Sequence, residues 1–134
     1  MNKNLILLPI FFLFVGCALV QKVDRIVRPP VFDSAEYGTL VDIRQMLEQE
    51  SMCDNPEEQV ALSLGLQKRI DWVHKYSEYI PRNEESVAML TTFKQEADTF
   101  VTHARDKANP TYCRLKLEGM SEQAVIIQRA LGNK

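Results

Sequence analysis

From residue 33 onward, apolar residues recur at intervals of three and four positions, with polar and charged residues between them. Side chains at this spacing share one face of an α-helix. The residues predicted to face a core are Tyr37, Leu40, Ile43 and Leu47; Leu62, Leu66, Ile70, Val73, Tyr76 and Ile80; Leu90, Phe93, Ala97, Phe100 and Ala104; and Cys113, Leu117, Met120, Ala124, Ile127 and Leu131. Sustained strand alternation and Gly-rich hairpin turns are missing, so the pattern predicts an all-α chain.

The first two helices have clear boundary signals. Asp33, followed three residues later by Glu36, matches a capping box, and the first helix is predicted to end near Glu50. The second helix opens at Asn55–Pro56, where Asn can cap the helix and Pro suits its first position. It is predicted to continue until Pro81, which cannot extend a helix.

The last two helices follow the same logic. The third begins at Asn83, and the fourth begins at a second Asn-Pro pair, Asn109–Pro110, and ends at Gly132. Gly119 lies inside the fourth helix and is expected to weaken it by about 1 kcal/mol, enough to kink or break it. Four amphipathic helices joined by short loops predict an up-down four-helix bundle over residues 33–134.

The N-terminus has a different pattern. Leu5–Val15 is a continuous apolar run that follows a single positive charge, Lys3, and precedes Gly16. This order is typical of a secretory signal peptide. An uncleaved transmembrane helix is the alternative, but Leu5–Val20 would span only about 24 Å of a hydrocarbon core about 30 Å thick. Length therefore favours a signal peptide over residues 1–16.

The end of this run resembles a known motif. Phe14-Val15-Gly16-Cys17 is similar to the lipobox of bacterial lipoproteins, although that family prefers Leu where this chain has Phe14. The resemblance implies cleavage before Cys17, attachment of several acyl chains to it, and stable membrane anchoring. Ala18 follows Cys17, whereas an Asp at that position typically retains lipoproteins at the inner membrane. The expected location is the inner leaflet of the outer membrane, facing the periplasm.

The cysteine count fits this interpretation. Three cysteines are awkward for a disulfide framework. If Cys17 carries lipid, Cys53 and Cys113 are left as a pair that an oxidising periplasm would allow to close. Both lie at the same end of an up-down bundle, which makes the bridge geometrically consistent. Two unrelated buried thiols are the alternative.

Residues 17–32 are predicted to be the lipidated cysteine and a tether. Lys22, Arg25 and Arg28 are interspersed with apolar residues before Pro29–Pro30, and the double proline prevents a continuous helix and stiffens the connection. The three cations suit anionic head groups, and a solvated linker is equally consistent.

Composition and motifs argue against several functions. The chain of 134 residues has a net charge of −2 and scattered basic residues, so it has no electrostatic footprint for nucleic acid. His74 and His103 are its two histidines, and the sequence has no metal-ligand spacing, nucleophile elbow or phosphate-binding glycine loop. We therefore predict a non-enzyme without metal, cofactor or small-molecule substrate.

One surface feature suggests a partner. Trp72, Tyr76 and Tyr79 step by four and three along the second helix, beside its core stripe. Aromatic residues with a polar tip are favoured at interfaces. This edge is the predicted contact for another envelope protein, and a wide buried face of a small bundle is the alternative.

The sequence therefore predicts a periplasm-facing lipoprotein that acts as a binding module. In build, the chain is also similar to short helical lipoproteins of Gram-negative bacteria and their tailed phages, and a phage origin would imply exclusion of superinfecting phage through an envelope receptor. Two other functions stay open: an uncleaved single-span accessory subunit, and a periplasmic hydrolase or metal carrier that uses His74 and His103.

Overall fold

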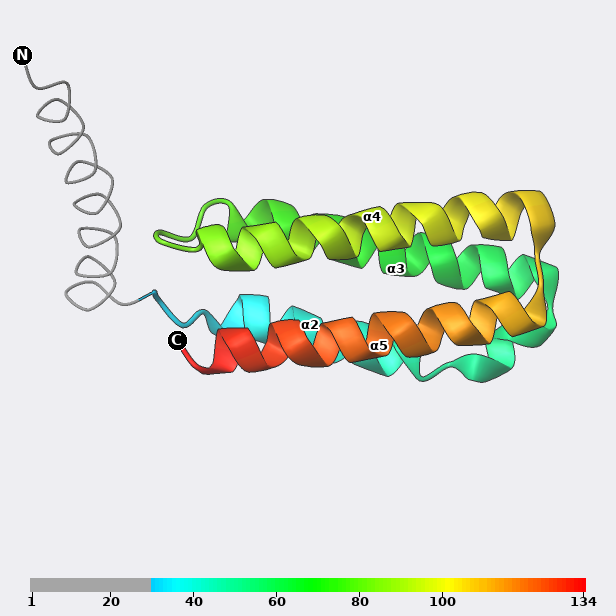
Figure 1. Cartoon of the computed structure of the whole chain (residues 1–134), viewed down its shortest axis with the longest axis horizontal. Coiled ribbons are helices and arrows are strands. Elements are labelled where there is room, and N and C mark those ends of the chain that lie inside the picture. Colours follow the sequence, from blue (N-terminus) through cyan, green and yellow to red (C-terminus); the bar gives the residue numbers. More distant parts are fainter. Residues whose placement is uncertain (1–29) are drawn as a thin grey trace, which may run out of the picture. The chain divides into compact units, whose positions relative to one another are not determined.

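Four helices run alternately up and down and pack side by side (Figure 1). The structure is a computed structural model, and it describes residues 30–134. Its elements in chain order are α2 (Ser34–Leu47), the 3₁₀-helix η1 (Glu50–Asp54), α3 (Pro56–Ser77), α4 (Glu84–Lys107) and α5 (Pro110–Gly132). No strand occurs among these described residues. The prediction of an all-α up-down bundle is confirmed.

The core contains the apolar stripes that the spacing predicts. Its buried members are Leu40, Ile43, Leu47, Cys53, Leu62, Leu66, Ile70, Val73, Leu90, Phe93, Ala97, Phe100, Cys113, Leu117, Met120, Ala124, Ile127 and Leu131. Tyr37, Tyr76 and Ile80 were expected in the stripes and are only partly buried. Each helix thus buries one face against its neighbours, which is the main source of stability for helices of this length.

Side-chain caps explain where three helices begin. The Asp33 carboxylate accepts hydrogen bonds from the backbone N–H groups of Ala35 and Glu36, both at 2.9 Å. The Asn55 side chain accepts a hydrogen bond from Glu57 N–H at the start of α3, and the Asn109 side chain accepts one from Tyr112 N–H at the start of α5. These bonds satisfy backbone donors that have no partner inside a helix. The predicted starts of α2, α3 and α5 are confirmed.

The prediction that Glu36 completes a capping box at the start of α2 is wrong. Its carboxylate is fully buried and accepts a hydrogen bond from Ser77 Oγ at 2.5 Å instead of turning back to the N-cap. The reason lies in the helical period. Glu36 is four residues before Leu40, so its side chain lies on the face of α2 that points into the bundle.

Two predicted helix ends need correction. α2 ends at Leu47 rather than near Glu50, and η1 follows it. α3 ends at Ser77, and the N–H of Ile80 bonds the carbonyl of Ser77 at 3.2 Å in a tighter turn. The residue before a proline avoids the helical conformation, so the helix ends before Pro81 is reached.

Gly119 neither breaks nor divides α5, which is one helix from Pro110 to Gly132. Apart from the backbone of its own helix and its two chain neighbours, a Cβ at position 119 would meet no atom within 4 Å. Gly119→Ala is therefore expected to raise the free energy of unfolding by about 1 kcal/mol, because Ala restricts the unfolded chain and costs no packing. Urea denaturation followed by circular dichroism measures this change.

Gly65 in α3 provides the control for that prediction. A Cβ at Gly65 would lie 3.0 Å from the terminal methyl of Met46, which would have to move. Gly65→Ala should therefore gain less stability than Gly119→Ala. Equal effects of the two substitutions would contradict this account of Gly119.

Candidate functional site

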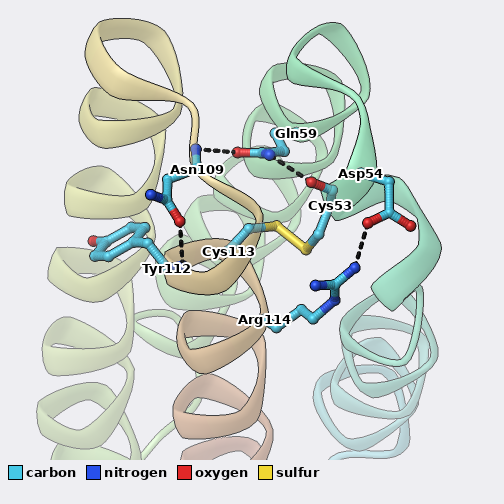
Figure 2. The surroundings of a disulfide bond; sticks show 7 residues. All are labelled: Cys53, Asp54, Gln59, Asn109, Tyr112, Cys113 and Arg114. Carbon is cyan, nitrogen blue, oxygen red and sulfur yellow. Dashed lines mark hydrogen bonds and ion pairs between the residues drawn. A yellow bond between two sulfur atoms is a disulfide. The ribbon is translucent and has the colours of Figure 1, made fainter.

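A disulfide joins η1 to the first turn of α5. The Cα atoms of Cys53 and Cys113 are 5.6 Å apart, and the two residues are 60 positions apart in the sequence. Both are fully buried, at the end of the bundle where α4 leads into α5 (Figure 2). This pairing confirms the predicted disulfide and its position in the bundle.

Polar contacts hold the same end together. Gln59 Nε2 donates to the carbonyl of Cys53 at 2.5 Å, and Gln59 Oε1 accepts from the backbone N–H of Asn109 at 3.1 Å (Figure 2). Arg114 forms an ion pair with Asp54 across the bridge. The amide of Gln59 thus ties η1 to the start of α5 independently of the sulfur atoms.

Cys17, the predicted lipidation site, lies outside the described residues, as do the signal peptide and nearly all of the tether. For residues 30–134, no helix is both long and apolar enough to cross a bilayer.

The three predicted interface aromatics do not form one continuous strip. Trp72 and Tyr76 stack with their ring centroids 5.0 Å apart, and 49% of Trp72 is exposed. Tyr76 Oη also donates to the carboxylate of Asp33 at 3.2 Å, which ties α3 to the start of α2. Tyr79 lies beyond the end of α3 and is 86% exposed. Trp72 and Tyr79 are accessible, whereas Tyr76 is partly a packing residue.

The two histidines lie in different surroundings. His74 Nε2 is 2.9 Å from Thr91 Oγ1, a contact between α3 and α4. His103 stacks on Tyr112 with a centroid distance of 3.6 Å. In the described part of the chain, no group of three His, Cys, Asp or Glu residues could hold a metal ion.

At the opposite end of the bundle, a buried polar cluster was missed by the sequence analysis. Glu36 accepts hydrogen bonds from Ser77 Oγ and from Asn83 Nδ2, the latter at 2.8 Å, and Lys134 Nζ lies 3.3 Å from its other oxygen. Glu36 is fully buried, and only 7% of the Lys134 side chain is exposed. The cluster fixes the start of α2, the α3–α4 loop and the end of α5 to one another.

A second charged network crosses the surface between α3 and α4. A hydrogen bond from Lys75 Nζ, at 2.8 Å, is the main cause that lowers the pKa of Asp71. A hydrogen bond from Gln67 Nε2, at 2.7 Å, is the main cause that lowers the pKa of Asp98. Lys94 lies between the two carboxylates, and its pKa is raised, chiefly by its hydrogen bond to Asp98.

These causes predict separate responses to substitution. Lys75→Met should raise the pKa of Asp71 while that of Asp98 stays low, and Gln67→Leu should do the reverse. NMR titration of the side-chain carboxyls measures both values, and a joint shift of both pKa values in either variant would contradict the assignment. Since both folded pKa values lie below the unfolded value of about 3.9, this stabilisation is present above that pH and is lost as the pH falls through the folded values.

Comparisons with known proteins add no identification. The chain matches no family model, no curated protein and no solved structure.

Proposed function

We propose that this chain is an exported lipoprotein, anchored through acyl chains on Cys17, whose helical bundle binds another envelope protein without catalysis. The observation that carries the proposal is the Cys53–Cys113 disulfide. A buried disulfide is suited to an oxidising compartment, and it accounts for two of the three cysteines. The cysteine left over, Cys17, is the last residue of the lipobox-like sequence.

The form of the bundle supports a binding role. Its helices are fixed to one another by a disulfide at one end and by the Glu36 cluster at the other, so its surface is a rigid scaffold. Trp72, which stacks on Tyr76, and Tyr79, just beyond the end of α3, add exposed aromatic area. Rigid surfaces with aromatic anchors lose little conformational entropy on binding.

The anchor is tested by intact mass and lipid labelling in a Gram-negative host. The membrane-extracted chain is expected to lack residues 1–16 and to carry the added mass of the acyl chains. Cys17→Ser should abolish both the incorporation of labelled palmitate and the removal of residues 1–16, because acylation and cleavage at a lipobox both require its cysteine.

The matched control is the Cys53→Ser/Cys113→Ser variant, which removes two cysteines and should still be labelled. An unlabelled full-length chain in the membrane would replace this proposal with the single-span subunit. Labelling of Cys17→Ser at the wild-type level would also contradict it.

A further inference from the structure

A hollow of about 460 Å³ lies between the end of α2 and the first half of α5. α2 has 14 residues and α5 has 23, which corresponds to about 21 Å and about 34 Å. α2 therefore stops short of the end of its neighbour and leaves part of α5 uncovered. The volume is in the range of ligand-binding pockets.

The hollow has an apolar floor. Leu47 and Leu117, which line it, are 3% and 1% exposed and belong to the core. Leu115 also lines the hollow. It lies within α5, and 63% of its surface is exposed, which is a large fraction for a leucine. An apolar side chain of a partner placed here would remove Leu115 from water, which is favourable in proportion to the area buried.

Acidic residues stand on both sides of this floor. Glu48 and Glu50 come from the α2 side, and Glu118 and Glu122 come from α5. None of the four forms an ion pair with another residue among those described, 30–134. The negative charge around the hollow is thus not balanced by an ion pair within residues 30–134.

The one cation in the lining does not neutralise these glutamates. Arg114 is engaged by Asp54, and Figure 2 shows its guanidinium directed toward that carboxylate. The hollow therefore has an uncompensated negative charge on each side of an apolar floor.

We propose that this hollow is a docking site for a basic amphipathic helix of a partner protein. Such a helix has an apolar stripe flanked by Lys or Arg, which matches the leucine floor and the glutamates on both sides. Charge complementarity of this kind orients the partner and speeds its association. The inference rests on the proposed binding function and names its partner class, but it does not depend on the lipid anchor.

The disulfide supports this assignment. Cys53 lies in η1, which begins at Glu50, and Cys113 immediately precedes Arg114 in α5. The two sides of the hollow are thus covalently linked close to its edge. A site held in shape before binding loses less free energy to ordering.

The test uses the full chain in an uncharged detergent and a labelled helical peptide with Leu at i, i+3, i+4 and i+7 and Lys on both flanks. Binding is measured by fluorescence anisotropy at low and at physiological salt. Glu118→Gln/Glu122→Gln should weaken binding about fivefold at low salt, with a smaller loss when salt screens the charges. Leu115→Ala should weaken it about tenfold at both salt concentrations.

Matched controls separate the site from general charge effects. Glu78→Gln/Glu84→Gln removes the same charge at the other end of the bundle and should leave binding unchanged. A peptide with Glu in place of Lys should not bind. Circular dichroism of each variant establishes that its fold is intact.

Three results would overturn the inference. One is equal affinity of the peptide for the wild type and for Glu118→Gln/Glu122→Gln, and another is no binding to the wild type. The third is self-association of the chain that Leu115→Ala abolishes, because it would identify a second copy as the occupant. Because the peptide assay does not depend on acylation, its outcome is distinguishable from failure of the lipid-labelling test.

Discussion

Replacing Cys53 and Cys113 together by Ala is expected to lower the free energy of unfolding by about 4 kcal/mol. The bridge spans 60 residues, and in the chain-entropy account a closed loop of that length strongly restricts the unfolded state. Domains of this size have total stabilities of about 5–15 kcal/mol, so the variant should be close to marginal. Urea denaturation of both proteins gives the difference.

Reductant supplies the control for this prediction. Wild-type protein unfolded and refolded with reductant should have the same urea midpoint as the double variant, and the variant should not respond to reductant at all. Both sulfur atoms are buried, so reduction of the folded protein should be slow and limited by opening of the fold. An unchanged midpoint for reduced wild-type protein would show that the bridge does not stabilise the bundle.

Most of the fold could be predicted because its determinants are local. The Asn-Pro pairs at Asn55 and Asn109 begin helices through bonds to backbone groups two or three residues away. The three- and four-residue spacing identifies the core face of each helix from neighbours in the same helix. The disulfide followed from the cysteine count together with the alternation of helix direction.

The buried polar cluster could not be predicted in the same way. Glu36 satisfies a local pattern, the capping box, and at the same time occupies a core-facing position four residues before Leu40. Its partners Ser77, Asn83 and Lys134 are 41, 47 and 98 residues away. No pattern within a single helix predicts contacts over such separations. Whether Glu36 caps α2 or is buried in the cluster depends on how α2, the α3–α4 loop and the end of α5 pack together.

The hollow beside α5 was missed for a related reason. Its residues are unremarkable in sequence, since Leu115 and Glu118 fit an ordinary helix surface. What exposes them is the early end of α2 at Leu47, and the sequence predicted that end near Glu50. A difference of a few residues at one helix end thus decides whether a neighbouring face is covered.

The cluster at the opposite end of the bundle gives the second large expected effect. Glu36→Ala and Lys134→Met should each lower the free energy of unfolding by about 3 kcal/mol, because each leaves a buried charged group without its opposite charge. A matched surface pair, Arg69 and Asp42, is more than half exposed, and Arg69→Met should cost less than about 1 kcal/mol. Urea denaturation of the three variants makes the comparison.

The double variant distinguishes a coupled pair from two independent contacts. Once Glu36 is absent, Lys134 has no carboxylate to lose, so the combined loss should fall short of the sum of the single losses by about 1–3 kcal/mol. A strictly additive result, or a Lys134→Met variant as stable as Arg69→Met, would mean that Lys134 does not hold α5 to α2. A coupled result would establish that a buried ion pair fastens this end of the bundle, where the start of α2 meets the end of α5.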